Sequence, residues 1–129
     1  MCIRDRIYID THIAVWLCAG VVGKLSDKAK DLLNGHEIRI SPIVRLELQY
    51  LYEIKRVTLP ANDIVADLSH SIGLKVCDKD FNAVLHRAIA LTWIRDPFDR
   101  IIVAHALLNE DYLVTMDQTM LDNYTKSIC

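Results

Sequence analysis

Four acidic residues occupy positions where a carboxylate side chain needs an explanation. Asp10 and Asp117 each end a short apolar run of the kind that forms buried strands. Glu47 and Asp99 lie on or beside the apolar side of a helical pattern, which should face the core. Carboxylates are rarely buried without partners, because removing the charged form from water costs several kcal/mol. One explanation is that the four side chains share a pocket.

A shared pocket of this kind would have the chemistry of a divalent-cation site. Carboxylates that lie close together raise one another's pKa values unless a cation compensates their charge. Oxygen ligands without His or Cys suit a hard ion such as Mg²⁺ or Mn²⁺. Such an ion keeps several water ligands and leaves a place for phosphate oxygens. The four acids therefore predict a divalent-cation site that can take a phosphate group.

Each carboxylate also has a simpler structural explanation. Asp96 stands before Pro97 and is a good N-cap, and Asp99 could complete a capping-box-like exchange three residues later. On this stretch alone, helix capping is the more common role of such a pair. Asp10 and Asp117 could equally be polar loop residues after strands. Convergence of the acids at one place would separate the two explanations.

The elements that would position these residues alternate between strands and helices. Strands separated by helices indicate parallel pairing with right-handed crossovers, and in such sheets ligands collect at the carboxyl ends of the strands. The sequence therefore predicts a three-layer α/β/α sandwich with a central four- or five-stranded parallel sheet. The last dozen residues allow a short helix and a fifth strand. The predicted strands are 7–9, 38–40, 74–76 and 112–116; the predicted helices are 13–18, 26–33, 42–56, 64–72, 81–89 and 97–108.

Length and composition limit the possible classes of protein. The chain has 129 residues, 52% of them hydrophobic, which fits one compact domain. Its formal net charge of −2 provides no general attraction for a polyanion. The four cysteines form no C-x-x-C pair, which favours reduced thiols in a cytoplasmic protein, and no apolar run is long enough to cross a membrane. Residues 1–6 resemble a translated adapter, so the expected domain is 7–129.

Four segments resemble the PIN-domain ribonucleases, most closely the VapC-like toxins of bacterial toxin–antitoxin pairs. These segments are YIDTH, SPIVRLELQYL, RDPFDRIIVAHA and LVTMDQ. The resemblance implies an Mg²⁺- or Mn²⁺-dependent endoribonuclease, usually a homodimer, that a small antitoxin inhibits and that cleaves elements of transfer RNA or ribosomal RNA. His105 departs from the family, in which a Gln is common at this position. The catalytic acids that the resemblance implies are Asp10, Glu47, Asp99 and Asp117, with Asp96 and Thr115 also matching the family.

Specific roles can be assigned to these residues as hypotheses. Asp10 and Asp99 would hold the principal ion, and the other two acids would complete its shell or bind a second ion. Thr11 or Thr115 would orient a carboxylate or a water molecule by hydrogen bonding. Arg100 and Arg95 would contact phosphate, although a solvated helix end or an ion pair with Asp96 explains them equally well. Further basic candidates for contacting RNA are Arg45, Lys55 and Arg56.

The aromatic and apolar surface residues have less specific interpretations. Trp16 and Trp93 could stack on bases, but their apolar neighbours favour packing in the core or in a dimer interface. His12, His86 and His105 are interpreted as structural rather than catalytic, because a metal ion makes a protein base unnecessary. An antitoxin helix or a second subunit could cover apolar positions that one core does not need. These positions are Val21, Val22, Leu51 and Tyr52.

Two other classes of function remain as alternatives. Another Mg²⁺-dependent phosphoryl-transfer domain is one, although an aspartyl phosphatase would place a second Asp where this chain has His12. A non-catalytic binding module on the same PIN-like fold is the other, and the presence of all four acids speaks against it. A nicotinamide-binding role is disfavoured because no glycine-rich turn follows the first strand.

Overall fold

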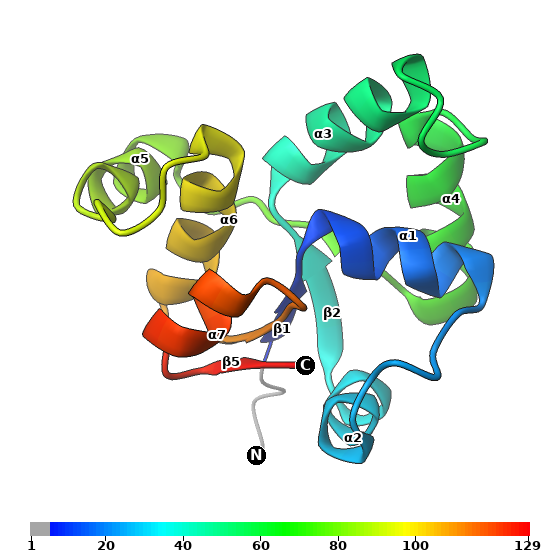
Figure 1. Cartoon of the computed structure of the whole chain (residues 1–129), viewed down its shortest axis with the longest axis horizontal. Coiled ribbons are helices and arrows are strands. Elements are labelled where there is room, and N and C mark those ends of the chain that lie inside the picture. The colour runs from blue at the N-terminus through cyan, green and yellow to red at the C-terminus, as the bar shows by residue number, and fades with distance from the viewer. Residues whose placement is uncertain (1–5) are drawn as a thin grey trace.

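The computed structural model describes residues 6–129, which form a five-stranded, fully parallel sheet with helices on both faces (Figure 1). The strand order is β3-β2-β1-β4-β5, so the first strand lies at the centre. This arrangement confirms the predicted three-layer α/β/α sandwich, with the fifth strand present. The strands are β1 (Arg6–Ile9), β2 (Glu37–Ile40), β3 (Lys75–Val76), β4 (Tyr112–Val114) and β5 (Ser127–Ile128).

The helices divide into two groups around the sheet. In Figure 1, α5 and α6 lie on one side of the strands, and α1, α3 and α4 lie on the other. Tyr8 of β1 faces the first group, since its ring lies 6.5 Å from that of His105 in α6. The helices are α1 (Thr11–Ala19), α2 (Asp27–Gly35), α3 (Pro42–Glu53), α4 (Ala61–Ile72), α5 (Phe81–Ile89), α6 (Pro97–Leu107) and α7 (Gln118–Asn123).

The central strand β1 is apolar on both faces because helices cover both sides of the sheet. Ile7, Tyr8 and Ile9 are each fully buried, so the strand appears in the sequence as a continuous apolar run rather than an alternating one. In the parallel register, Ile9 stands beside Val114 of β4. The residues that follow these two strands therefore emerge at the same edge of the sheet.

Two helices end at residues in the left-handed backbone conformation. Gly20 after α1 has a φ of 75° and Gly73 after α4 has a φ of 70°, where glycine carries no steric penalty. Beyond the end of a third helix, α3, Lys55 also has a left-handed backbone conformation, with a φ of 64°, and the next N–H, that of Arg56, donates to Leu51 O at 2.8 Å. This closure ends α3 at Glu53, so the predicted extension of the helix to residue 56 is wrong.

The other differences from prediction lie at the ends of elements. The strand expected to reach Met116 ends at Val114, although the Thr115 N–H still donates to Ile128 O of β5 at 2.9 Å. Arg6, assigned above to an adapter-like leader, is the first residue of β1 and stands opposite Glu37. The rest of that expected leader, residues 1–5, lies outside the described residues. Within 6–129, none of the helices has the length and apolar character needed to span a bilayer.

Candidate active site

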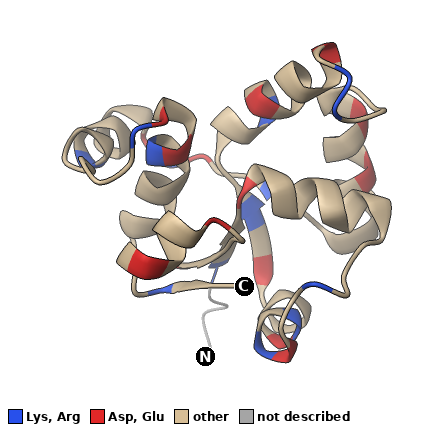
Figure 2. Ribbon diagram, viewed as in Figure 1, with Lys and Arg blue, Asp and Glu red and all other residues tan. Residues whose placement is uncertain are grey.

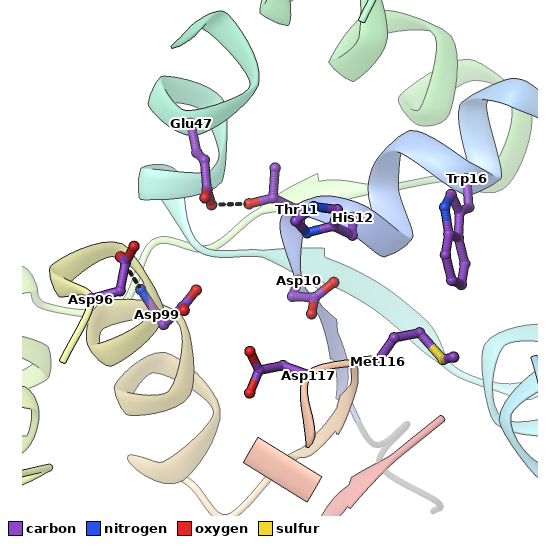
Figure 3. A pocket seen from close by; sticks show the side chains of 9 residues that line it. All are labelled: Asp10, Thr11, His12, Trp16, Glu47, Asp96, Asp99, Met116 and Asp117. Carbon is purple, nitrogen blue, oxygen red and sulfur yellow. Dashed lines mark hydrogen bonds between the residues drawn. The ribbon is translucent and has the colours of Figure 1, made fainter. Parts of the chain in front are cut away.

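A cavity of about 380 Å³ opens at the carboxyl edge of the central strands (Figure 3). Asp10 follows β1 and Asp117 follows β4, while Glu47 reaches the cavity from α3 and Asp99 from the first turn of α6. All four acids singled out in the sequence therefore line the same cavity. The full lining is Asp10, Thr11, His12, Trp16, Glu47, Asp96, Asp99, Met116 and Asp117.

Three of the acids around this cavity are helix N-caps. Oδ1 of Asp10 accepts from the Ile13 N–H at 3.0 Å at the start of α1, and Oδ1 of Asp117 accepts from the Met120 N–H at 3.0 Å at the start of α7. Helix N-termini carry partial positive charge, which favours carboxylates there. Figure 2 shows acidic positions at the segments that begin α1, α6 and α7, around the middle of the molecule.

Asp96 is the third of these caps and belongs to α6. Its Oδ1 accepts from the Phe98 N–H at 2.7 Å and from the Asp99 N–H at 3.2 Å (Figure 3). Helix capping and a shared pocket, the two explanations considered for these acids, are therefore both present in the structure. Asp96 satisfies the open N–H groups of the first turn, and this turn presents Asp99 to the cavity.

A buried hydroxyl joins the two strand-end acids. Thr115 is fully buried, and its Oγ1 donates to Oδ2 of Asp10 while it accepts from the Asp117 N–H at 3.0 Å. Asp10 itself is only 6% exposed. Its Oδ1 accepts from the Ile13 N–H and its Oδ2 accepts from Thr115, so each carboxylate oxygen accepts one hydrogen bond. The carboxylate is held in one orientation at the end of β1.

A second hydroxyl holds Glu47 in place. The Thr11 Oγ1 donates to Oε1 of Glu47, which links the first residue of α1 to the second turn of α3 (Figure 3). Burial raises the pKa of Glu47, the hydrogen bond from Thr11 opposes that rise, and the charge of Asp96 adds to it. Glu47 is thus a partly buried acid whose orientation depends on α1.

Asp99 is the least compensated of the acids. Its backbone N–H is bound by Asp96, but within residues 6–129 its carboxylate receives no hydrogen bond. Burial raises the pKa of Asp99 to about 7, and the charges of Asp96, Glu47, Asp117 and Asp10 add to the effect in that order. Burial also raises the pKa of Asp10, against the hydrogen bonds from Thr115 and Ile13. Asp10 and Asp99 therefore each hold a proton more tightly than a free aspartic acid does.

The donor set fits a hard divalent cation. Most of its polar side chains are carboxylates, joined by the Thr11 hydroxyl and the His12 imidazole, and no Lys or Arg is present among the described residues that line the cavity. Within 6–129, however, no three His, Cys, Asp or Glu side chains form a compact metal-binding group. The acids surround the cavity rather than closing into a cage. This spacing suits an ion such as Mg²⁺, which keeps several water ligands and takes only one or two carboxylates directly.

The basic residues considered above lie away from the main cavity. The Arg100 Nε donates to Ile94 O at 2.6 Å, and Arg100 does not line the main cavity. A second, smaller hollow adjoins that cavity; Arg95 lines it and Arg100 does not. Arg45 lines a hollow between α3 and α4, and Arg56 lines another beside α1. His105 is fully buried in α6, where its Nδ1 lies 3.1 Å from Ile101 O.

The second hollow, of about 200 Å³, adjoins the main cavity and shares Asp96, Asp99 and Asp117 with it. Its remaining lining is Trp93, Ile94, Arg95, Thr119 and Met120. Each hollow thus contains one tryptophan, Trp16 or Trp93, and each tryptophan is partly buried against the core. The sequence favoured packing for both, and the structure shows packing together with exposure to the site.

His12, Trp16 and Met116 line the cavity, whereas the sequence favoured a structural role for His12 and packing for Trp16 and gave Met116 no role. Spacing offered a signal for the first two, because Trp16 lies four residues after His12 and such residues share a helix face. Met116 directly precedes Asp117. Figure 3 shows the side chains of Trp16 and Met116 on the side of the cavity away from Asp96.

Comparisons with known proteins agree with this fold. The structure is similar to VapBC2 from Rickettsia felis bound to a DNA fragment from its promoter, with 20% identity, 95% of this chain and 96% of that chain covered, and a TM-score of 0.66. It is also similar to a toxin–antitoxin complex from Klebsiella pneumoniae, with 20% identity, 95% and 96% coverage and a TM-score of 0.67. DNA-bound VapBC from Salmonella typhimurium gives 18% identity, 95% coverage of each chain and a TM-score of 0.65.

A search of curated proteins found no match to the chain. The family assignment comes instead from a match to a protein-family model. Residues 7–126 match the PIN domain, which is nearly the whole chain and includes every acid of the cavity. This chain therefore belongs to the PIN-domain family.

Proposed function

We propose that this PIN-domain chain is a divalent-metal-dependent endoribonuclease and the toxin of a bacterial toxin–antitoxin pair, active on cytoplasmic RNA. The observation that carries the proposal is the cavity itself. Four carboxylates from separate elements line it, and the pKa of Asp99 is raised to about 7 in a lining that contains no Lys or Arg among the described residues. The similarity of the fold to toxin–antitoxin structures supports the biological part of the proposal.

In this proposal, Asp10 and Asp99 hold the principal Mg²⁺ ion, for which Mn²⁺ substitutes. Glu47 and Asp117 complete its surroundings through water or hold a second, weaker ion. The bound metal supplies charge neutralisation at the scissile phosphate and a water of lowered pKa. Cleavage then leaves a 5′-phosphate and a 3′-hydroxyl.

The hydroxyl groups act in this scheme as positioning groups. Thr115 fixes the Asp10 carboxylate through its Oγ1 and at the same time accepts from the Asp117 N–H. Thr11, at the start of α1, fixes the Glu47 carboxylate of α3 through the hydrogen bond that its Oγ1 donates. Asp96 places the first turn of α6, and therefore Asp99, by capping it. Such supporting contacts are typically worth 10- to 100-fold in metal affinity or activity.

The test of this proposal is cleavage of RNA by the purified chain with Mg²⁺ or Mn²⁺, compared with a chelator and with the Asp99→Asn variant. We expect new RNA 5′ ends, carrying phosphate, only for the unmodified chain with metal. Sequencing these ends after induced expression would identify the RNA, for which transfer RNA and ribosomal RNA are the proposed classes. Cleavage that persists with chelator, or equally in Asp99→Asn, would overturn the proposal.

An antitoxin and a second copy of the chain are the proposed protein partners. An apolar hollow of about 330 Å³ beside α1 and α4 could take an apolar helix of the antitoxin. Of the four apolar positions suspected from the sequence, Val21, Val22 and Tyr52 are exposed and none lines this hollow. The hollow is lined by Val15, Cys18, Ala19, Arg56, Val57, Thr58, Leu59 and Ile64.

Both partners can be tested directly. Co-expression with the product of a short open reading frame next to the gene should give a stable complex without RNA cleavage. Multi-angle light scattering at micromolar concentration should give the mass of a homodimer. A monomer in that measurement would remove the dimer from the proposal and leave the nuclease assignment intact.

A further inference from the structure

We propose that Lys79 is a positioning residue that sets the place of α6, and with it Asp99, relative to the central strands. The expected effect on metal binding and cleavage rests on the proposed function, whereas the placement of α6 rests on the contacts of Lys79 itself. Lys79 lies between β3 and α5, on the face of the sheet that α6 covers, and its side chain is 6% exposed.

The Lys79 ammonium contacts three segments that are far apart in the sequence. Its Nζ donates to the His105 carbonyl of α6 at 2.5 Å and to Oδ2 of Asp111, just before β4, at 3.1 Å. It also lies 4.7 Å from the centroid of the Tyr8 ring in β1, within the range of a cation–π interaction. One buried cation therefore joins α6 to β1 and to the start of β4.

The three elements that Lys79 joins are also the ones that carry three acids of the cavity. Asp10 directly follows β1, Asp117 follows β4, and α6 presents Asp99 from its first turn. An α-helix rises 1.5 Å per residue, so the six residues from Asp99 to His105 span about 9 Å. Lys79 therefore acts on α6 at a distance from the cavity, which it does not line.

Lys79 completes the C-terminal end of α6. The last four carbonyls of an α-helix have no partner inside the helix. In α6, three of them accept from backbone N–H groups of the following turn at 2.8 to 3.0 Å, and the fourth, that of His105, accepts from the Lys79 Nζ. The partial negative charge at a helix C-terminus favours a cation there. Asp96 thus caps one end of α6, and Lys79 holds the other.

The ion pair of Lys79 with Asp111 is largely buried, which makes it a poor source of stability. Apolar residues of similar volume often stabilise a fold as well or better, because they avoid the loss of hydration of two charges. What the pair adds here is one fixed arrangement of the elements it joins. Asp99 depends on that arrangement, because within residues 6–129 its carboxylate accepts no hydrogen bond and its place follows that of α6. A misplacement of about 1 Å in an active site can cost about 100-fold in rate.

Three variants of the full chain separate positioning from stability. Lys79→Met leaves the Asp111 carboxylate without its partner, so we expect it to unfold at a lower urea concentration. Lys79→Met combined with Asp111→Asn removes both charges and should recover part of that loss. The matched control is Lys75→Met, because the Lys75 Nζ also pairs with a carboxylate, that of Glu37 at 3.2 Å, but joins only β3 and β2.

The placement of α6 is measured first, by NMR and without metal. The N–H groups of Phe98 and Asp99 both donate to Oδ1 of Asp96, so their resonances report on the first turn of α6. We expect both resonances to move, and the hydrogen exchange of both amides to accelerate, in the folded double variant and not in Lys75→Met. If the double variant does not fold, Lys79→Arg takes its place, because it keeps the charge while its larger, planar guanidinium fits the site differently.

Metal binding and catalysis are measured next on the same proteins. The double variant should bind Mn²⁺ about tenfold more weakly in isothermal titration, the lower end of the range for groups that support a metal ligand. Its kcat for RNA cleavage should fall by about tenfold or more, with KM within about twofold, because the change affects the reacting groups rather than the surface that binds RNA. Lys75→Met should match the unmodified chain in both measurements.

The outcomes distinguish this inference from the proposed function. Unmoved resonances of Phe98 and Asp99 in the double variant would overturn the positioning role and leave the nuclease assignment in place. Recovery of Mn²⁺ affinity and cleavage together with stability would overturn it as well, because Lys79 would then be only structural. Moved resonances with weaker Mn²⁺ binding and slower cleavage would support it. Moved resonances, in a protein whose unmodified form neither binds Mn²⁺ nor cuts RNA, would support the placement of α6 by Lys79 and reject the ribonuclease.

Discussion

Asp99 differs from the other acids of the site in having no hydrogen bond to its carboxylate from residues 6–129. Thr115 and the Ile13 N–H hold Asp10, and Thr11 holds Glu47. Asp99 instead faces the charges of four other carboxylates, and burial together with these charges raises its pKa to about 7. A residue in this condition contributes little to the metal-free fold and is available to a cation.

Replacing Asp99 by Asn therefore separates function from stability. We expect cleavage to fall by more than about 100-fold, because even groups that only support a metal ligand are typically worth 10- to 100-fold. The metal-free protein should unfold at the same or a higher urea concentration, since one of several repelling charges is gone. Matched denaturation and cleavage assays on the same preparation check both parts. An unfolded variant would show that Asp99 is structural.

The raised pKa of Asp99 also predicts how stability depends on pH. Its carboxyl group binds a proton more tightly in the folded chain than in the unfolded one, so between about pH 4 and 7 the folded state holds more protons. The free energy of unfolding of the metal-free protein should therefore decrease as pH rises through this window. Solvent screening limits the loss due to Asp99 to on the order of 1 kcal/mol.

Urea denaturation with a chelator at pH 5 and at pH 7.5 measures this effect. Asp99→Asn should show a shallower decrease than the unmodified chain, and the difference between the two isolates the contribution of Asp99. Metal affinity should change in the opposite direction and rise toward pH 7, because the ion binds the ionised carboxylate. Identical pH profiles for the two proteins would contradict the assignment.

Thr115 is the residue whose loss should affect both the fold and the site. Thr115→Val keeps the shape but removes the donor to Asp10 and the acceptor for the Asp117 N–H. A buried polar group left without a partner costs about 1–3 kcal/mol, and this is the destabilisation we expect in urea unfolding. Thr125, which is exposed and lines neither the cavity nor the hollow beside it, serves as the control when changed to Val. Activity should fall in the first variant and stay within about twofold in the second.

At the scale of elements, three helices begin at the cavity and each begins with a carboxylate cap. Asp10, Asp96 and Asp117 hold the first turns of α1, α6 and α7. The backbone dipoles of these helices present partial positive charge at their N-termini, which moderates the repulsion among the acids. Because each of these three acids caps a helix, its position is fixed when that helix forms.

Two substitutions of Asp96 distinguish its capping role from its charge. Asp96→Ala should destabilise the chain by about 1 kcal/mol, because the Phe98 and Asp99 N–H groups lose their acceptor. Asp96→Asn keeps an acceptor and should leave stability nearly unchanged, while it lowers the pKa of Asp99 by removing the charge that contributes most to its rise. Thermal unfolding measures the first effect, and NMR titration of Asp99 measures the second. Equal destabilisation by both variants would argue against a cap.

The sequence predicted the elements better than it predicted their ends. Apolar runs and periodicity identified the strands and helices up to β4, because burial on a sheet or a helix face requires that pattern, whereas α7 and β5 were only allowed by the last dozen residues. The end of α3 depended on Lys55 adopting a left-handed conformation, which is uncommon for a residue other than glycine and leaves no clear signal in the sequence. The strand order also depended on packing between segments far apart in the chain.

The candidate site could be predicted in its acids but not in its walls. Asp10 and Asp117 were recognisable because strand ends in a parallel sheet share one edge. For Trp16 and Trp93 the sequence favoured packing over a place at the site, because an aromatic residue that packs against the core and also lines a cavity looks like any other core residue in the sequence, and Met116 was not recognised. Exposure to a cavity is a property of the assembled fold.

At the scale of the whole molecule, the proposed metal site predicts that the free energy of unfolding depends on metal concentration. A cation that binds only the folded chain stabilises it by about 2.7 kcal/mol at a concentration 100 times its Kd. Mg²⁺ or Mn²⁺ should therefore raise the melting temperature of the unmodified chain, with little effect on Asp99→Asn. Differential scanning fluorimetry against metal concentration measures this, with Ca²⁺ and NaCl of equal ionic strength as controls. Equal shifts in both proteins would indicate a nonspecific salt effect.

The placement of Asp10, Asp96 and Asp117 at helix starts has a consequence for how such a chain can change over generations. Asparagine and serine begin helices about as well as aspartate does. A lineage can therefore lose the negative charge at these positions while the backbone keeps its shape. Under the proposed function, descendants that carry Asn or Ser there should be inactive and still bind the antitoxin.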